Sequence, residues 1–358
     1  MSKLIFKMES KNQTKLKEFI LLGLSDDPKL QMPLFAVGLL LYVLTLTENL
    51  AIMSLIQVDQ HLHSPMYFFL NNLSFTEICY ITTTMPRMLW DLLSGDKTIS
   101  FAGCVLQMYF FLTTAATEGA LLSAMAYDRY AAICHPLRYT LLMNQPVCRS
   151  LLAASWFIGK LNAIVNTTFV FSLNFCGSNK IVHFFCDIPP ILHLSCSDTS
   201  LAELVTFITS GSIMITTVSL IVLSYSFIVS AVLKIHTAQG RVKTFSTCAS
   251  HLTVASIFYS TAIFTYLRPS SSHSVEQDRL ISVLYTIITP LLNPLIYSFK
   301  NKKMQAAFLN VLRKKKDIIF SECSSFLFSG HVTLRNIRRI KWEILFIYWL
   351  VHEPQLSF

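Results

Sequence analysis

The chain has 358 residues, of which 53% are hydrophobic and only 14% are charged, and its formal net charge is +9. Soluble globular domains carry about 25% charged residues, so this composition excludes an ordinary soluble domain and indicates a membrane protein. The positive charge does not require a nucleic-acid partner, because basic residues on one face of a membrane protein interact with anionic lipid.

Apolar stretches near the roughly 20 residues needed to cross a bilayer recur along the whole chain. None alternates apolar and polar residues as a barrel strand does. A segment in lipid must satisfy its own backbone groups, so we expect helices. The predicted fold class is an all-α membrane protein, a seven-transmembrane-helix bundle. The predicted spans are 32–56, 66–89, 105–127, 151–171, 201–233, 245–267 and 281–299.

Basic residues indicate the orientation of the bundle. Lys and Arg favour the cytoplasmic side in short loops, and here they flank the third-to-fourth and fifth-to-sixth connections and follow the seventh span. Lysines before the first span compete with this signal, but acids partly offset them. Asn12 lies in a glycosylation acceptor, which requires an outer N-terminus. We therefore divide the chain into an extracellular N-terminus (1–31), the bundle (32–299), a short amphipathic basic eighth helix (300–316) and an atypical cytoplasmic tail (317–358).

Four cysteines lie on the predicted outer side. Cys104 begins the third span, and Cys176, Cys186 and Cys196 lie in the long fourth-to-fifth connection. An oxidising compartment permits disulfides there, and four cysteines allow three pairings. As an alternative, His183-x-x-Cys186-Asp187 contains three types of metal ligand.

An acid-base pair, Asp128 and Arg129, stands where the third span ends and a basic loop begins. Charged residues at the edge of a span more often have a functional role than none, so the pair indicates a switch. The alternative is a plain surface contact, which contributes little.

The seventh span contains Asn293-Pro294-x-x-Tyr297. Proline removes a backbone donor and clashes with the preceding turn, so we expect a kink that acts as a hinge. Asn293 and Tyr297 can exchange polar partners, which favours a switch over a passive bend.

Two acids, Glu77 and Glu118, lie deep within the second and third spans. Each costs about 2.5–3.5 kcal/mol at the bilayer centre if unpaired, so both need partners. With Asn293 they can coordinate a sodium ion or share a proton. The alternative is a pair of hydrogen-bonded structural acids.

Four motifs stand in order along the chain, Pro65-Met66-Tyr67-Phe68-Phe69-Leu70, Met125-Ala126-Tyr127-Asp128-Arg129-Tyr130-Ala131-Ala132-Ile133-Cys134, Phe245-Ser246-Thr247-Cys248-Ala249-Ser250-His251 and Pro290-Leu291-Leu292-Asn293-Pro294-Leu295-Ile296-Tyr297. With these motifs the chain resembles, over roughly 12–316, an olfactory receptor of the tetrapod-type class, within the rhodopsin-like G-protein-coupled receptors. The resemblance implies disulfides Cys104–Cys186 and Cys176–Cys196, a multi-pass plasma-membrane location, and an odorant-activated G protein of the stimulatory olfactory type that raises cyclic AMP.

The resemblance also implies residue roles. Asp128 would hold Arg129 at rest and release it on activation. The switch residues are Asp128, Arg129, Tyr130, Tyr225, Asn293, Pro294 and Tyr297.

No acid lies between Cys104 and Thr117, which argues against a cationic ligand. We expect a small, mostly apolar volatile, with Tyr259 and Tyr266 able to orient a carbonyl or alcohol. By family position the ligand-binding residues are Met108, Phe111, Leu112, Ala115, Thr209, Ile213, Tyr259, Ala262, Tyr266 and Val283.

The chain departs from the family at Glu48, where a small residue is usual, and in its extension to Phe358. The alternative function is therefore a nonfunctional or non-olfactory variant of the same family. A transporter would show internal repeats, and an enzyme would show a recognisable catalytic motif. We see neither, and expect no enzymatic activity and no cofactor other than the sodium ion.

Overall fold

The computed structural model describes residues 17–25, 27–176, 178–235, 237–266, 275–299, 301, 303–311 and 313. One compact unit ends at Lys300 and a second begins at Asn301. In the second unit, 303–311 is helical, within the predicted basic helix. The predicted glycosylation site at Asn12 and the tail 317–358 lie outside the described residues.

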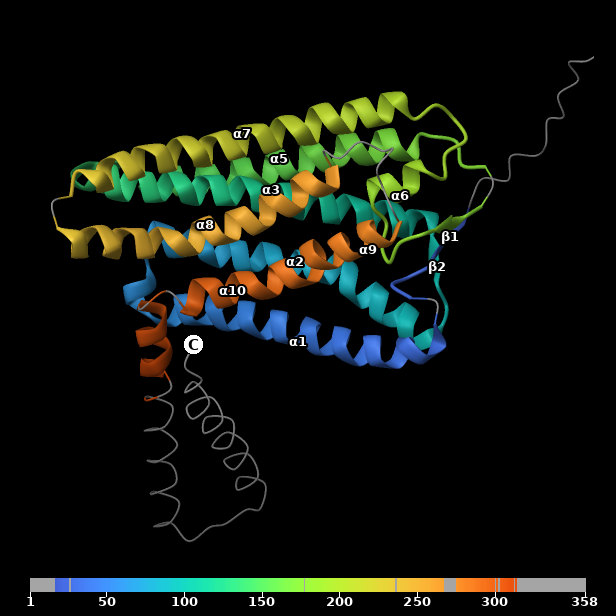
Figure 1. Ribbon diagram of the computed structural model, residues 1–358, viewed down its shortest axis with the longest axis horizontal. Helices are drawn as coiled ribbons and strands as arrows, with labels where there is room; N and C mark the ends of the chain where they lie inside the picture. Colours follow the sequence, from blue (N-terminus) through green and yellow to red (C-terminus); the bar gives the residue numbers. More distant parts are fainter. Residues whose placement is uncertain are drawn as a thin grey trace, which may run out of the picture. The chain divides into compact units, whose positions relative to one another are not determined.

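The first unit is built from long helices that run alongside one another (Figure 1). The predicted spans fall within these helices, apart from residue 267, which lies outside the described residues. The helices are α1 (Pro28–Val58), α2 (Pro65–Ser94), α3 (Phe101–Cys134), α5 (Gln145–Phe171), α7 (Ser200–Leu233), α8 (Ala238–Tyr266) and a continuous run of α9 (Val275–Val283), η4 (Leu284–Ile288) and α10 (Thr289–Phe299).

By length and apolar composition alone, three helices of the described chain are suited to cross a membrane, Pro28–Val58, Ser200–Leu233 and Arg279–Ser298. The other four long helices, α2, α3, α5 and α8, do not meet this measure. Of these, α2 and α3 carry the buried acids Glu77 and Glu118.

Local signals fix the helix ends. The side chain of Asp27 accepts a hydrogen bond from the backbone N–H of Lys29 at the start of α1. Asn144 caps α5 in the same way. Such caps satisfy backbone donors that have no partner within the helix. Gly95 ends α2 with φ +70°, a left-handed conformation that glycine adopts without strain. The short connecting helices are η1 (Gln60–Leu62), η2 (Pro136–Arg138), α4 (Tyr139–Leu142) and α6 (Ile188–Leu192).

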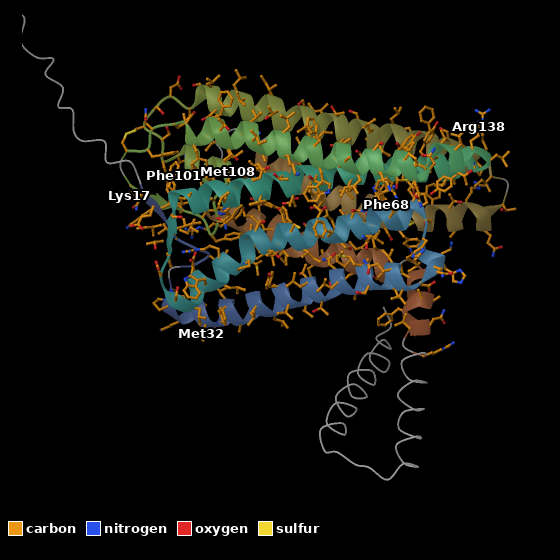
Figure 2. All side chains as sticks on the ribbon, turned by 180° about the vertical axis from the view of Figure 1, so that it is seen from behind. Lys17, Met32, Phe68, Phe101, Met108 and Arg138 are labelled. Carbon is orange, nitrogen blue, oxygen red and sulfur yellow. A yellow bond between two sulfur atoms is a disulfide. The ribbon has the colours of Figure 1, made fainter. Side chains whose placement is uncertain are left out.

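A small sheet, which the sequence did not predict, lies at one end of the helices, named here the sheet end (Figure 1). Its strands are β1 (Glu18–Leu21), β2 (Thr98–Ser100) and β3 (Lys180–Ile181), in the order β2-β1-β3. β1 is antiparallel to β2 and parallel to β3. Figure 2 shows Lys17 and Phe101 at the sheet end and Arg138 at the opposite end, named here the Arg129 end.

The sheet end is closed by an apolar core and two disulfides. Phe19 of β1 is fully buried and contacts the rings of Phe101 and Phe175. The disulfides are Cys104–Cys186 and Cys176–Cys196, as the resemblance implied.

α3 packs closely against α5 at Gly159. A Cβ added there would collide with the hydroxyl of Thr117 and the backbone carbonyl of Thr113. Because only glycine lets the two backbones approach this closely, Gly159 sets the spacing of α3 and α5.

Candidate functional site: an interhelical cavity and the Arg129 end

A cavity of about 100 Å³ lies among α3, α5, α7 and α8. No charged side chain lines it. Most of its surface is apolar, with a few amide and hydroxyl groups. Its lining residues are Leu112, Ala115, Ala116, Gly119, Asn162, Thr206, Phe207, Ser210, Gly211, Ile213, Met214, Thr217, Phe258, Tyr259 and Ala262.

Half of the predicted ligand-binding residues line this cavity, namely Leu112, Ala115, Ile213, Tyr259 and Ala262. The structure does not bring Met108, Phe111, Thr209 and Val283 to it. The side chain of Tyr266 lies outside the described residues.

The four residues that do not line the cavity have other neighbours. Met108 and Phe111 are buried in the core of the sheet end, against which Val283 also packs. The hydroxyl of Thr209 accepts a hydrogen bond from Asn166 Nδ2 at 3.0 Å. These residues therefore support the bundle around the cavity.

The prediction also missed lining residues, above all Asn162 on α5 and Thr206 and Ser210 on α7. Ser210 Oγ donates to Asn162 Oδ1 at 3.2 Å. An Asn within an apolar helix is a signal available in the sequence, because polar groups in a span face protein or ligand rather than lipid. Tyr259, expected to orient the ligand, donates its hydroxyl to the backbone carbonyl of Gly119 at 3.0 Å.

The two buried acids meet at Asn293. Its Nδ2 lies 2.8 Å from Glu77 Oε1 and 3.2 Å from Glu118 Oε1. All three side chains are at most 2% exposed. Asn293 Oδ1 is buried with no hydrogen-bond partner in the described part of the chain. Carboxylate and amide oxygens are the donors that a hard cation prefers, so this donor set fits sodium.

At the Arg129 end, the Arg129 guanidinium contacts Asp128 Oδ2 at 2.6 Å. Asp128 Oδ1 accepts a second bond, from the Tyr139 hydroxyl at 2.7 Å. Burial first, and then the neighbouring Asp128 carboxylate, raise the pKa of Tyr139, so its hydroxyl stays protonated and donates. Asp128 is thus held from two sides. Tyr130 lies apart from this contact and hydrogen-bonds His135 at 3.0 Å.

His251 of α8 joins three helices near the Arg129 end. Its Nε2 lies 2.8 Å from the Leu122 carbonyl of α3, and its Nδ1 lies 2.9 Å from the Tyr225 hydroxyl of α7. A carbonyl only accepts, so Nε2 donates to Leu122 and Nδ1 accepts from Tyr225. The sequence prediction included Tyr225 but gave His251 no role.

The predicted hinge residues, Asn293, Pro294 and Tyr297, lie in α10, which directly follows the π-helical segment η4. Pro294 is inside α10. Tyr297 is buried, and its hydroxyl has no hydrogen-bond partner among the described residues. The structure therefore does not join Tyr297 to Arg129 or Tyr225 by a hydrogen bond.

A buried polar network ties the connection between α5 and α7 to the seventh helical segment. His183 Nε2 lies 2.8 Å from Ser282 Oγ, which lies 3.0 Å from the Tyr285 hydroxyl. Tyr285 in turn donates to Asp187 at 3.0 Å. Burial, and then the positive charge of Arg279, lower the pKa of His183 to about 3, so the imidazole is neutral at pH 7.

The alternative metal site at His183-x-x-Cys186-Asp187 is wrong. The sulfur of Cys186 is bonded to Cys104, and His183 and Asp187 are engaged by Ser282 and Tyr285. Within the described ranges no group of three or more His, Cys, Asp or Glu residues is arranged to hold a metal ion.

Long apolar helices packed around an internal cavity are typical of a helical membrane protein. Residues 39–315 match the family model described as olfactory receptor. The chain is 52% identical over 313 residues to olfactory receptor 5F1 of Homo sapiens, covering 87% of this chain and 100% of that protein.

Similar relatives are olfactory receptor 5B21 of Homo sapiens, 50% identical over 85% of this chain and 98% of that protein, and olfactory receptor 5AP2 of Mus musculus, 50% identical over 85% and 96%. The chain belongs to the olfactory receptor family, and odorant reception is the function that this membership supports.

Proposed function

We propose that this receptor binds a small, mostly apolar volatile in the cavity among α3, α5, α7 and α8. Binding then activates a heterotrimeric G protein of the stimulatory olfactory type, which raises cyclic AMP. The observation that carries the proposal is the position of the cavity on the same three helices, α3, α7 and α8, that His251 joins near the Arg129 end.

The cavity favours a neutral ligand. A cation or anion would need a counter-ion in a low-dielectric interior, and no charged residue lines the space. The polar groups that do line it can orient a ligand that carries one oxygen function. This is the composition expected of a site for small volatile molecules.

α8 offers a physical route from the cavity to the switch. Tyr259 bonds to α3 beside the cavity, and His251 bonds to α3 and α7 eight residues earlier, about two helical turns away. A ligand that shifts α8 at Tyr259 therefore also acts on the His251 contacts. The two states differ in polar pairing, with Arg129 paired to Asp128 at rest and available to the G protein on activation.

We infer that all seven long helical segments cross the plasma membrane, with the sheet end outside and the Arg129 end in the cytoplasm. The disulfides of the sheet end suit an oxidising compartment. Basic residues such as Arg138 and Arg149 stand near the opposite end and suit the cytoplasmic side. Glycosylation at Asn12 belongs to the same topology.

We also infer that Glu77, Glu118 and Asn293 bind a sodium ion that modulates the receptor. The ion would screen two buried carboxylates that otherwise repel each other or share a proton. Glu118→Gln should then remove any effect of sodium on the response. A sodium-dependent response that survives this substitution would reject the assignment.

A receptor variant that does not signal is the second candidate, and Glu48 favours it. Its Oε2 is buried without a hydrogen-bond partner in the described part of the chain. An unsatisfied acid within a helix bundle destabilises the folded state. Glu48→Gly restores the small residue of the family and should raise surface expression if this acid is the defect.

The test is odorant-evoked cyclic AMP in cells that express the full chain, with surface staining, next to a version that ends after Lys316. Arg129→Ala should leave surface staining unchanged and abolish the response. An unchanged response in Arg129→Ala would contradict the switch. Surface expression of both versions without any response would favour the second candidate.

A further inference from the structure

Two glycines line the cavity, and they differ in what surrounds them. A Cβ on Gly119 would lie 3.3 Å from Cε1 of Phe258 and 3.4 Å from the hydroxyl of Tyr259. A Cβ on Gly211 would have no atom within 4 Å. Packing therefore restricts Gly119 to a small residue, whereas nothing in the described protein fills the space beside Gly211.

Backbone geometry does not require glycine at Gly211 either. The residue lies inside the 34-residue helix α7, and the positive-φ glycines of the described chain are Gly23 and Gly95. Glycine in a helix interior is less favourable than alanine. The absence of a side chain at Gly211 therefore leaves open space in the cavity.

The polar side of the cavity has a similar contrast. Two hydroxyls of α7 line the cavity and are paired: Thr217 donates to the Ile213 carbonyl at 2.9 Å, and Ser210 donates to Asn162 Oδ1 at 3.2 Å. The hydroxyl oxygen of Thr206 is buried and has no hydrogen-bond partner among the described residues. A buried hydroxyl without a partner is unfavourable, so a ligand that pairs with it gains affinity.

We propose that Thr206 and Gly211 determine which ligands this receptor accepts. The ligand is compact and carries one hydrogen-bonding oxygen, an alcohol or a carbonyl. That oxygen pairs with the Thr206 hydroxyl, and the apolar body of the ligand lies in the space beside Gly211, which sets its upper size. The inference rests on the proposed function, because it concerns the same cavity.

The test uses straight-chain primary alcohols, 2-ketones and alkanes of about four to ten carbons as probes. The longest of these chains exceed what a cavity of this size accepts, so the series can measure an upper length limit. Gly211→Leu should lower the potency of the longest accepted alcohols and ketones by about tenfold and leave the shortest unchanged. Ser212→Leu is the matched control, since it adds the same side chain at an exposed neighbour. Gly211→Ala, which favours the helix, gives a smaller shift in the same direction if Gly211→Leu does not reach the surface.

Thr206→Val should lower the potency of alcohols and ketones by about fivefold and leave alkanes unchanged, because it removes one neutral hydrogen bond and keeps the shape. Thr206→Ser keeps the hydroxyl and should restore potency.

Each probe is measured twice, as evoked cyclic AMP and as the shift in melting temperature of the purified full chain in detergent. Probe-induced stabilisation that depends on Gly211 and Thr206, without cyclic AMP, supports the inference and contradicts the proposed coupling. Equal length profiles for the native receptor and Gly211→Leu overturn the inference. A native receptor that no alcohol or ketone stabilises or activates also overturns it.

Discussion

The two ends of α3 are held in different ways. At the sheet end, Cys104 is bonded to Cys186, and the Gln107 side chain bridges the Thr83 carbonyl and the Cys186 amide at 3.0 Å each. At the Arg129 end, one ion pair and the Tyr139 hydroxyl hold Asp128. Covalent and buried polar contacts fix the first end, whereas the contacts of the second can exchange partners. A bundle built this way can change at one end while the other stays fixed.

Loss of the Cys104–Cys186 disulfide should have the largest effect. It closes a loop with a sequence separation of 82, so its removal should cost about 4.5 kcal/mol by loop entropy. The paired variant Cys104→Ser with Cys186→Ser, which leaves neither partner as an unpaired thiol, should lose most surface staining. The same change at Cys176 and Cys196 opens a separation of 20 and should cost about 3 kcal/mol. Native surface levels in the Cys104→Ser, Cys186→Ser variant would show that this disulfide does not stabilise the sheet end.

An intermediate effect on stability is expected between the two ends of α3, where this helix packs against α5. Gly159→Ala forces a methyl group against the hydroxyl of Thr117 and the carbonyl of Thr113, and such overpacking costs about 1–3 kcal/mol. Gly211→Ala is the control, since the same substitution meets open space. The melting temperature of the purified receptor should fall in the first variant and hold or rise in the second. Equal melting temperatures would contradict the close approach of α3 and α5.

At the Arg129 end, Tyr139→Phe removes one of the two contacts of Asp128. A hydrogen bond to a charged group contributes about 1.5–3 kcal/mol. Only the part of this energy that favours the resting receptor over the active one changes the balance between the two states. Basal cyclic AMP should rise up to about tenfold, since 1.4 kcal/mol changes a two-state ratio by that factor. Tyr127→Phe, one residue before Asp128, is the matched control and should leave basal signalling unchanged. A rise in both variants, or in neither, would show that Tyr139 does not restrain the switch.

The sequence predicted the helices well, because long apolar runs in a membrane protein have few other solutions. The acids Glu77 and Glu118 were expected to need partners on the same physical ground, and Asn293 lies between them. The pairing of Cys104, Cys176, Cys186 and Cys196 did not follow from physical reasoning on the sequence. Their number allows three pairings, and only the family resemblance selected the one that the structure contains.

Two features could not be predicted. The strands of the sheet are two to four residues long and come from distant parts of the chain, so no periodic pattern marks them. The cavity depends on how each helix is rotated. On α7 the prediction chose Thr209 and Ile213. Ile213 lines the cavity, but Thr206 and Ser210 line it in place of Thr209. One residue along a helix turns the side chain by about 100°, a rotation that apolar composition does not fix.

Mild acid should act on the sheet end and give the smallest effect. Burial, and then the charge of Arg279, lower the pKa of His183 to about 3 from its ordinary value of 6.5. Below pH 6.5 the unfolded chain therefore binds a proton that the folded chain does not. Stability is fully present above that pH and is lost as the pH falls. Between pH 7 and 6 the loss is about 0.7 kcal/mol, and it steepens towards about 1.4 kcal/mol per pH unit at lower pH.

The groups around His183 support this direction of the pH effect. Ser282 contacts its Nε2, and the rings of Phe184 and Phe185 pack on it. Ser282 and Tyr285 lie between the imidazole and the Asp187 carboxylate in this network. No carboxylate in the described chain contacts the imidazole directly to stabilise its charged form. His183→Gln keeps a hydrogen-bonding group and does not titrate, so its melting temperature should fall less between pH 7 and 5.5. If the melting temperatures of the native receptor and His183→Gln fall equally between pH 7 and 5.5, the acid-sensitive group is a residue other than His183.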